Sequence, residues 1–475
     1  MQSRKPTTPP PRSFYWYDLE TSGTHAASDR IMQFAGRRTD AALNPIDEPY
    51  TTFVRLAADV LPHPEACVVT GITPQRANAE GVDEWEALSE VDRRMREPGT
   101  CVVGYNNLRF DDDFLRFGLY RNLMDPYARE WQEGNSRWDL IDLARAACAL
   151  RPDGIQWPRE DGVVTFRLER LCAANGIRQD SPHDALWDVE ATIGLARLLK
   201  AAQPRLWTYA LDQRIRGNVA ALLLPLGRRL CVHVSRRFSN ERFCAAPVVS
   251  VAVHPEIRNR VVVADLSRDI DMLLDCDSEE LKRRVFGDLA DDEERAPVKE
   301  VVLNRCPFVA PIEVVRADDA ERLGFDLETI ERRRQALASV PDLATRIGNA
   351  YRREPSTSRL DDAEFALYDH FIDDADKAAL NSLQTALATD APWPAFHSDD
   401  ERLVTLALRL KARLRPTELD VHEAVTWQDH VRACLEAGFG RRPSLADFRE
   451  EVAALGQNPE ASAIVRQLAA YEPLT

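Results

Sequence analysis

Residues 13–20 read SFYWYDLE, an aromatic run that ends with Asp18 and Glu20, which are separated by one residue, Leu19. Aromatic residues are enriched in strands, so the run predicts a buried strand. Side chains two residues apart on a strand share one face, about 7 Å apart at a rise of roughly 3.3 Å per residue. Two carboxylates placed in this way repel each other, and a bound cation would relieve the repulsion. Taken alone, the pair is more typical of two exposed acids at a strand edge, because Asp-x-Glu is common by chance.

The segment around this run, from residue 13 to residue 200, alternates strand and helix patterns. Such alternation predicts an α/β layer domain. The strand candidates are IMQFAGRRTD (31–40), YTTFVRL (50–56) and TCVVGYNN (100–107), and the helix candidates are 73–95, 167–176 and 184–203.

The remaining chain changes character twice. Between residues 201 and 355, β-rich runs separated by turn residues predict a small, mainly antiparallel barrel with added helices. From residue 356 onward nearly every segment has a helical pattern. The β-rich runs are 229–237, 246–255, 260–267 and 298–311, and the clearest helical segments are 361–372, 400–414, 426–439 and 444–456.

Composition sets limits on the class of protein. The chain has 475 residues, a soft indication of about three domains, and no run of about 18 apolar residues that would span a membrane. The start, MQSRKPTTPPPR, predicts a disordered tail over residues 1–12 and not a secretory signal. Nine dispersed cysteines without a Cys-x-x-Cys pair argue for reduced thiols in the cytoplasm, against disulfides and against a zinc cluster. The net charge of −16 confines any nucleic-acid contact to a local basic groove.

Two further motifs in the first 200 residues carry acids. The stretch GYNNLRFDDDF contains Asp111, Asp112 and Asp113, which alone would be typical of the acidic first turn of a helix. His183 follows a proline at the expected start of a helix, and Asp188 lies one turn further on. A single histidine is more often structural than catalytic. An ordered set of all three motifs within one α/β segment is rare by chance, and together they indicate an acidic active site.

These motifs resemble those of the DEDDh exonucleases. Asp18 and Glu20 match the first motif of that family, Asp111 the second, and His183 and Asp188 the third. Asp111 is chosen by its place after a phenylalanine, as in the family pattern, because physical reasoning alone does not separate it from its two neighbours.

The resemblance narrows to the bacterial exonuclease I subgroup and extends over the whole chain. It is carried by DLETSGTHAASDRIMQFAGRRTD, LPHPEACVVTGITPQRA, GYNNLRFDDDF, HPEIRNRVVVADL, NRCPFVAP and FIDDADKAAL, and it is most specific in the first domain. It implies a ribonuclease H-like α/β exonuclease domain (13–200), a mainly β SH3-like barrel domain (201–355) and an all-α C-terminal domain (356–475).

The family chemistry implied is 3′→5′ degradation of single-stranded DNA to 5′-mononucleotides. Two Mg²⁺ ions, with Mn²⁺ as a substitute, would be held by Asp18, Glu20 and Asp188, with Asp111 assisting. A carboxylate-rich site favours such hard cations over zinc. His183 would take a proton from the attacking water, as a pKa of about 6.5 allows. The family also implies roles in recombination and mismatch repair.

Contacts with the DNA strand are expected from aromatic and basic residues. The stretch from Asp125 to Trp138 interleaves both kinds, although its aromatics are equally typical of a packed loop. Glu20 would also meet the substrate. By resemblance the other candidates are Arg116, Tyr127, Trp131, Arg145 and Arg167, with Arg216, Asn259 and Lys299 from the barrel domain.

A protein partner is also implied, the acidic C-terminal tail of the single-stranded DNA-binding protein. Arg151, Tyr209 and Arg316 match positions that resemble its pocket, and arginine suits a terminal carboxylate. Pro311 departs from the pattern, and the two arginines are equally typical of an ordinary surface.

The alternatives are another DEDDh enzyme, acting on small RNA or in polymerase proofreading, and a catalytically silent scaffold that binds nucleic acid. The two added domains argue against the first, and the filled active-site positions argue against the second. The family suggests a monomer that encloses the strand, in the cytoplasm and associated with the nucleoid, without contact with a membrane.

Overall fold

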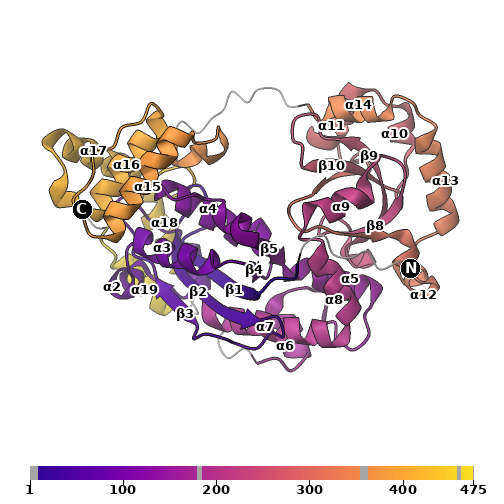
Figure 1. Cartoon of the computed structure of the whole chain (residues 1–475), viewed down its shortest axis with the longest axis horizontal. Helices are drawn as coiled ribbons and strands as arrows, with labels where there is room; N and C mark the ends of the chain where they lie inside the picture. The colour runs from indigo at the N-terminus through magenta and orange to yellow at the C-terminus, as the bar shows by residue number, and fades with distance from the viewer. Residues whose placement is uncertain (1–8, 179–183, 353–361, 457–461, 474–475) are drawn as a thin grey trace. The chain divides into compact units, whose positions relative to one another are not determined.

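The computed structural model describes residues 9–178, 184–352, 362–456 and 462–473. Contacts divide the chain into two compact units. The first unit described below consists of Pro11–Ser136, Asp180–Glu190 and Ser358–Thr475, and the other consists of Met1–Pro10, Arg137–Gln179 and Ala191–Thr357. Figure 1 gives the labels of the helices and strands. Within the described residues, no helix combines the length and apolar character needed to cross a membrane.

The N-terminal part of the chain forms a mixed five-stranded sheet with the strand order β3-β2-β1-β4-β5. The central strand β1 pairs antiparallel with β2 and parallel with β4. The predicted strand over SFYWYDLE is therefore present, and Asp18 and Glu20 lie near the end of β1. The strands are β1 (Ser13–Thr21), β2 (Ile31–Asp40), β3 (Tyr50–Phe53), β4 (Thr100–Gly104) and β5 (Ser136–Asp139).

Helices cover one face of this sheet in the first unit. Tyr15, Tyr17 and Leu19 of β1 pack into one apolar cluster with side chains of α3 and α4, such as Val91 and Phe114. Because side chains alternate along a strand, Asp18 and Glu20 point to the opposite face. The helices before and after β4 are α1 (Pro64–Thr70), α2 (Pro74–Glu80), α3 (Glu84–Met95) and α4 (Asp111–Arg121).

The predicted helix over residues 73–95 is two helices. Gly81 ends α2, and its N–H donates to the carbonyl of Ala77. A Cβ atom at Gly81 would lie 2.4 Å from that carbonyl oxygen, so the close approach requires glycine. Asp83 then precedes the first residue of α3.

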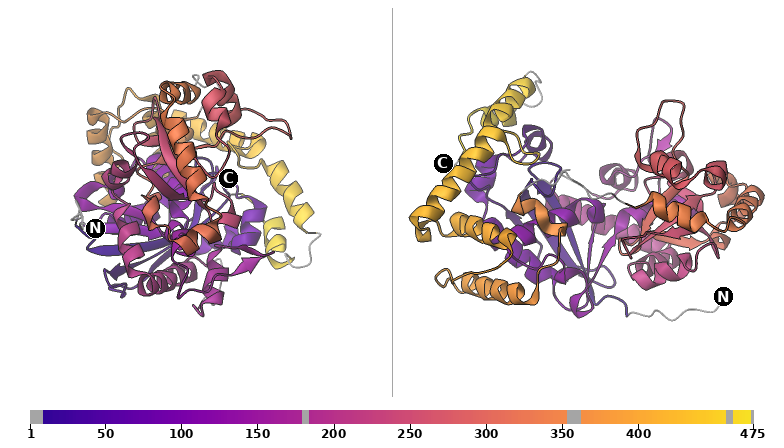
Figure 2. Two further views of the ribbon diagram at one scale, coloured as in Figure 1. Left: turned by 90° about the vertical axis from the view of Figure 1, so that its right-hand side faces the viewer. Right: turned by 90° about the horizontal axis from the view of Figure 1, so that it is seen from above.

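The C-terminal segment is mainly helical, as predicted. Figures 1 and 2 show these orange and yellow helices beside the N-terminal part of the same unit. Phe448 of α18 and Leu468 of α19 join one apolar cluster with Cys67 of α1 and Leu56. Residues 361–372 differ from the prediction of an α-helix, because the described part forms a 3₁₀ turn, η6 (Ala363–Tyr368), which Asp362 caps. The helices are α15 (Asp374–Ala388), α16 (Glu401–Leu414), α17 (Val421–Ala437), α18 (Leu445–Leu455) and α19 (Ser462–Ala469).

The other unit contains an antiparallel five-stranded sheet with the order β11-β10-β9-β8-β12. The run 298–311 forms two strands at opposite edges, separated by a turn in which Cys306 has φ 48°. The strands are β8 (Leu230–Val234), β9 (Ala245–Val253), β10 (Arg260–Asp265), β11 (Val298–Val302) and β12 (Phe308–Pro311). A two-stranded ribbon is formed by β6 (Arg159–Glu160) and β7 (Val163–Val164).

Helices flank this second sheet, and α13 and α14 contact β9. The helices are α5 (Leu140–Leu150), α6 (Leu168–Ala174), α8 (Pro204–Asp212), α9 (Arg216–Leu223), α10 (Asp271–Asp275), α11 (Ser278–Phe286), α12 (Ala317–Leu323), α13 (Leu327–Ala338) and α14 (Leu343–Ala350). The helix α7 (Ala185–Ala202) starts in the first unit and continues in the other.

Candidate active site

Three carboxylates from distant parts of the sequence converge at the end of β1. Asp18 and Glu20 come from β1, and Asp188 comes from the first turns of α7. One ligand atom from each lies within 4.8 Å of the others. This arrangement matches the prediction that the acids of the first and third motifs gather at one place.

The electrostatics of this group favour a cation. Burial raises the pKa of Glu20 to about 8, and the charges of Asp188, Asp111 and Asp184 act in the same direction. Burial also raises the pKa of Asp18 well above its usual value, with further contributions from Asp111, Asp188 and Glu20. Each of these side chains thus resists ionisation beside the others, and a divalent cation would offset their repulsion. Oxygen donors alone suit a hard ion such as Mg²⁺ or Mn²⁺.

The three consecutive aspartates of α4 have different surroundings. Asp112 accepts a hydrogen bond from the buried guanidinium of Arg129. Asp113 interacts with Arg116 at 3.4 Å and accepts from the hydroxyl of Tyr368 at 3.4 Å. Asp111 is the member of the run whose charge acts on both Asp18 and Glu20. The surroundings therefore separate three residues that physical reasoning from the sequence alone did not separate.

The start of α7 carries the third motif. His183 lies outside the described residues. Asp184 accepts a hydrogen bond from the N–H of Leu186 at 3.1 Å, so it caps the start of α7. Asp188 follows within the same helix and is the residue that joins the acidic group.

The DNA-contact candidates in this unit differ in exposure. Trp131 presents 66% of its surface to solvent. Arg116 is buried, and its Nε and Nη2 donate to the carboxylate of Glu130 at 2.7 and 2.9 Å. The same guanidinium lies 5.5 Å from the centre of the half-buried Tyr127 ring. Trp131 is therefore the most accessible of these three side chains.

Most of the DNA-contact candidates in the other unit already make contacts within the protein. Arg167 and Arg216 are exposed, and Arg216 donates to the carbonyl of Arg258 at 3.2 Å. Arg145 is buried and pairs with Asp142 at 2.9 Å. Lys299 Nζ lies 2.8 Å from His233 Nε2, and Asn259 donates to Asn304 at 2.6 Å.

The three partner-site candidates lie within one unit. Arg151 pairs with Asp319 at 3.1 Å, and the N–H of Arg316 donates to the same carboxylate at 3.2 Å. Burial lowers the pKa of Arg151, and the charge of Arg316 lowers it further, which reflects two neighbouring cations. The hydroxyl of Tyr209 donates to the carbonyl of Val309 at 2.8 Å.

Two exposed aromatic residues of the C-terminal segment, one of which contacts the aspartate run, were not among the candidates from the sequence. Tyr368 and Phe371 are 57% and 90% exposed. The ring of Tyr368 meets Phe117 edge-on at 5.6 Å, and its hydroxyl reaches Asp113. The sequence signal was the pair of aromatics in ALYDHFI, which was interpreted only as part of a helical segment.

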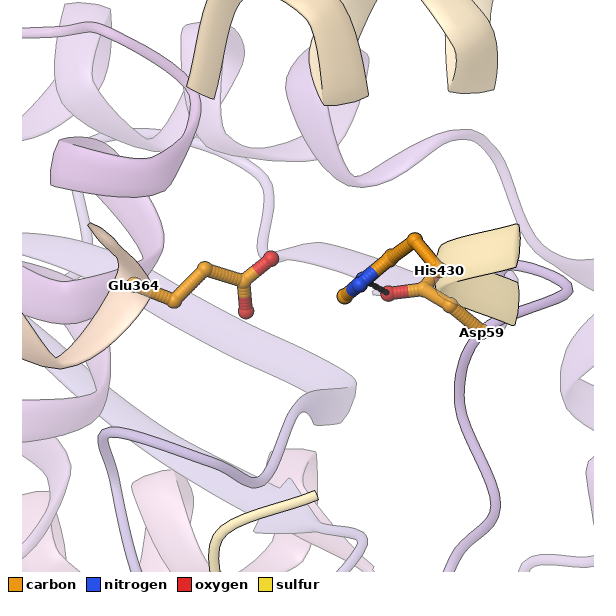
Figure 3. A group of neighbouring side chains, drawn as sticks. All are labelled: Asp59, Glu364 and His430. Atoms are coloured by element: carbon orange, nitrogen blue, oxygen red, sulfur yellow. Dashed lines mark ion pairs between the residues drawn. The ribbon is translucent and has the colours of Figure 1, made fainter. Parts of the chain in front are cut away.

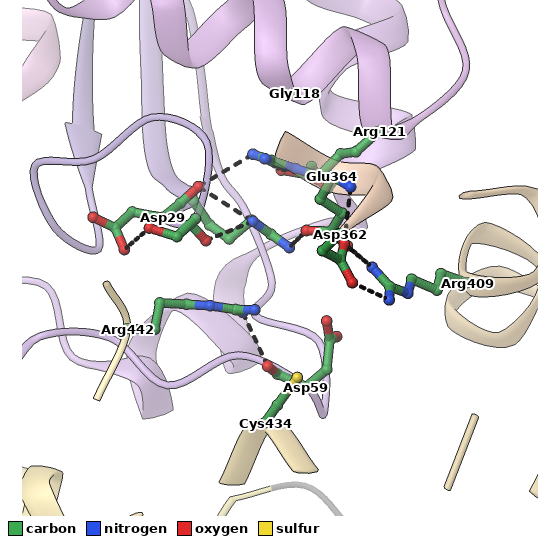
Figure 4. Close-up of polar contacts among 12 residues, drawn as sticks. Asp29, Asp59, Gly118, Arg121, Asp362, Glu364, Arg409, Cys434 and Arg442 are labelled. Atoms are coloured by element: carbon green, nitrogen blue, oxygen red, sulfur yellow. Dashed lines mark hydrogen bonds and ion pairs between the residues drawn. The ribbon is translucent and has the colours of Figure 1, made fainter. Parts of the chain in front are cut away.

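A second group with metal-ligand residue types consists of Asp59, Glu364 and His430 (Figure 3). Arginines already pair with both carboxylates. Arg413 donates to Asp59 at 2.6 Å and to Glu364 at 2.7 Å, and Arg30 donates to Glu364 at 2.6 Å. Figure 4 shows the neighbouring ion pairs of the network.

The pKa values of these carboxyls support the same interpretation. Burial alone would raise the pKa of Glu364, but Arg30 and Arg413 hold it well below its usual value. Arg413 and the hydrogen bond with His430 do the same for the buried Asp59. We therefore interpret this group as a buried ion-pair network and not as a metal site.

Family comparisons cover three segments of the chain. Residues 15–196 match the family described as Exonuclease, residues 214–353 match the Exonuclease I SH3-like domain, and residues 361–473 match the Exonuclease I C-terminal domain.

Individual relatives agree with these matches. The exodeoxyribonuclease I of Escherichia coli (strain K12) is 39% identical over 430 residues, which cover 90% of this chain and 90% of the relative. A crystal structure of E. coli exonuclease I in complex with a dA16 oligonucleotide has a TM-score of 0.92 at 39% identity, covering 97% of this chain and 98% of that one. A zinc-bound form of the E. coli complex with single-stranded DNA has a TM-score of 0.91 at 38% identity, with the same coverage. With these motifs, domains and relatives, the chain belongs to the exonuclease I family.

Proposed function

We propose that this protein is a 3′→5′ exodeoxyribonuclease that degrades single-stranded DNA and releases 5′-mononucleotides. The observation that carries the proposal is the convergence of Asp18, Glu20 and Asp188 within the segment that matches the exonuclease family. The relatives named exodeoxyribonuclease I, one of them solved with a DNA oligonucleotide, support the choice of substrate.

The acidic group fits two divalent cations, which we propose to be Mg²⁺ with Mn²⁺ as a substitute. Asp18, Glu20 and Asp188 would hold the ions, and Asp111 would assist directly or through water. Bound ions of this kind supply an activated water and neutralise charge on the scissile phosphate. The zinc in the related complex belongs to that structure, and the oxygen-only donor set here favours harder ions.

The protein groups around the ions have separate tasks. His183 would accept the proton of the attacking water, and Glu20 would also contact the terminal nucleotide. Trp131 and Tyr127 would stack on bases, and the exposed Tyr368 and Phe371 would offer further rings for stacking.

Basic and amide side chains would hold the phosphates of the strand. Arg116 would have to give up its ion pair with Glu130 to bind a phosphate, whereas Arg167 is already exposed. The other members of the set would act in the same way: Arg145, Arg216, Asn259 and Lys299.

The remaining parts of the proposal concern the cell. Arg151, Tyr209 and Arg316 would bind the acidic C-terminal tail of the single-stranded DNA-binding protein, because paired arginines recognise carboxylates. The division into domains at 13–200, 201–355 and 356–475 is retained as a proposal, with the added domains enclosing the strand and lowering its dissociation rate. We place the protein as a monomer in the cytoplasm at the nucleoid, acting in recombination and mismatch repair.

One gel experiment tests the central proposal. Single strands labelled at the 3′ or the 5′ end are incubated with and without EDTA, next to duplex DNA and RNA controls. We expect immediate release of the 3′ label as mononucleotide, Mg²⁺ dependence, and loss of activity in Asp18→Ala. Preferential digestion of RNA would instead favour the small-RNA enzyme, and release of no nucleotide would favour a binding scaffold.

A further inference from the structure

An ion pair links strand β2 to helix α7 beside the acidic group. Arg37 of β2 pairs with Glu190 of α7 through its Nη1. Both side chains are partly buried, with 23% and 28% of their surface exposed. Glu190 is two residues beyond Asp188, so the pair attaches to the same part of the helix as a carboxylate of the acidic group.

The register of the sheet places Arg37 on the face that carries the acids. Trp16 of β1 lies opposite Arg37, and Asp18 lies opposite Ala35. Directly opposed residues of an antiparallel pair point to the same face, as do residues two apart on one strand. Arg37 and Asp18 therefore share a face of the sheet, and α7 is attached to that face at Glu190.

Together, the two positions fix the orientation of the first turns of α7, which belong to the same unit as β1 and β2. In an α-helix with 3.6 residues per turn, two residues that are two positions apart differ by a rotation of about 200° about the helix axis, so their side chains leave the helix on nearly opposite sides. Asp188 faces Asp18 and Glu20, which repel it, and Glu190 faces Arg37, which attracts it. The attractive contact therefore holds the helix start against the repulsion among the acids.

Arg37 depends strongly on this one partner. Within the part of the chain that the structure describes, Glu190 is the only residue whose side chain pairs with the Arg37 guanidinium. The Nε of Arg37 is buried without a hydrogen-bond partner among the same residues. Removing Glu190 would thus leave a partly buried cation unpaired, an arrangement that costs more than losing both partners.

We propose that Arg37 and Glu190 are positioning residues, which set the place of Asp188 and thereby the affinity of the site for divalent ions. This inference rests on the proposed metal site. The pair would act before substrate binds, because it orients a metal ligand. Residues that orient metal ligands commonly affect metal affinity by about 10- to 100-fold.

The test measures Mn²⁺ binding to the full-length protein without DNA. The variants are Arg37→Met, Glu190→Gln, the double variant and the exchanged pair Arg37→Glu with Glu190→Arg. Calorimetry gives the dissociation constant, and the increase in melting temperature on adding Mn²⁺ gives a second readout. We expect roughly tenfold weaker binding in each single variant, at the lower end of the range for such residues. The double variant should be no weaker than the singles, and the exchanged pair should recover most of the affinity.

A matched control is the exposed pair Arg76–Glu80 of α2 in the same unit. Arg76→Met should leave Mn²⁺ binding unchanged. Wild-type affinity in both single variants, or losses that simply add in the double variant, would overturn the inference. If the wild-type protein itself bound no Mn²⁺, the proposed metal site would be wrong, which separates the two failures. A purely structural role would lower the melting temperature in EDTA without changing the dissociation constant.

Discussion

Arg129 pairs with Asp112 and not with the adjacent Asp111: its Nη2 lies 2.8 Å from Asp112 Oδ1, and both side chains are buried. The pair ties the first turn of α4 to the loop that carries Tyr127 and Trp131. It leaves Asp111 directed at the acids of β1, where its charge acts on Asp18 and Glu20. Asp112 therefore has a structural role, whereas the adjacent Asp111 is a candidate catalytic residue.

This division predicts opposite phenotypes for two neighbouring substitutions. Asp112→Ala should lower the free energy of unfolding by about 3–5 kcal/mol, because it removes the nearest carboxylate from the buried Arg129 and leaves it the longer pair with Glu130, at 3.8 Å. Asp111→Asn should not lower the free energy of unfolding, because it relieves repulsion on Asp18 and Glu20, but it should lose at least about 100-fold in nucleotide release, as a lost charge-stabilising group does. Equal stability of the two variants would contradict the assignment.

Removing one acid of the candidate site should stabilise the metal-free protein. The folded-state pKa of Asp18 lies well above its unfolded value, so stability is full below about pH 4 and is lost as the pH rises through the folded pKa. Asp18→Asn should therefore raise the melting temperature in EDTA at about pH 8, while nucleotide release is abolished. A scan of melting temperature against pH checks this, and Glu48→Gln, at an exposed position of the same unit, serves as a control. An unchanged or lower melting temperature for Asp18→Asn would show that the acids do not destabilise the fold.

The ion-pair network should make the protein sensitive to acid. The folded-state pKa of Glu364 lies well below its unfolded value of about 4.3, so its contribution is present above that pH and is lost as the pH falls further. Glu364→Gln should destabilise the protein by several kcal/mol at neutral pH, on the order of 3–5 kcal/mol for a broken buried pair. It should also flatten the loss of stability between about pH 5 and pH 3. Urea unfolding across this range provides the measurement, and parallel pH profiles for wild type and variant would contradict it.

Exposed aromatics should contribute to strand affinity. Trp131→Ala and Phe371→Ala should each weaken binding of single-stranded DNA by about 1–3 kcal/mol, the usual value of a base–aromatic stack. Fluorescence anisotropy in EDTA measures binding without degradation. Val69→Ala is the matched control, because Val69 is 61% exposed on α1. If either aromatic variant binds as tightly as the control, that side chain does not stack on a base.

Charge reversal should separate partner binding from catalysis. Arg316→Glu should abolish binding of a synthetic peptide that ends in an acidic C-terminal carboxylate, because Arg316 and Arg151 act as neighbouring cations. Nucleotide release from a short strand should stay at the wild-type rate. Glu313→Arg, at an exposed position in the same region, tests for a nonspecific effect of charge. Peptide binding that survives Arg316→Glu would place the partner elsewhere.

The fold class was predictable from local patterns. The aromatic run SFYWYDLE is sufficient to identify β1, and the two-residue period of a strand places Asp18 and Glu20 on one face. The comparisons confirm the combination of exonuclease, SH3-like and C-terminal domains. The break at Gly81 was missed because helical periodicity continues on both sides of it, and only the approach to the Ala77 carbonyl shows why a glycine interrupts it.

The candidate site was predictable only as a set of motifs. Spacing identifies the acids but does not separate Asp111 from Asp112, because their difference arises from Arg129, which is distant in the sequence. The pairing of Arg116 with Glu130 was hidden for the same reason. The exposed Tyr368 was not identified as a candidate, because the pattern of residues 361–372 predicted a helix and gave no information on exposure. The roles of these residues stay predictions until the variants are measured.

The packing of α18 and α19 on α1 decides how this enzyme can be dissected. Phe448 and Leu468 shield Cys67 and Leu56 from water, so the last residues of the chain complete a core that the first hundred residues begin. A fragment without α18 and α19 would expose this apolar surface and would tend to aggregate. Truncated variants are therefore poorly suited to mapping the function of each domain. Single-residue substitutions in the full-length chain are better suited.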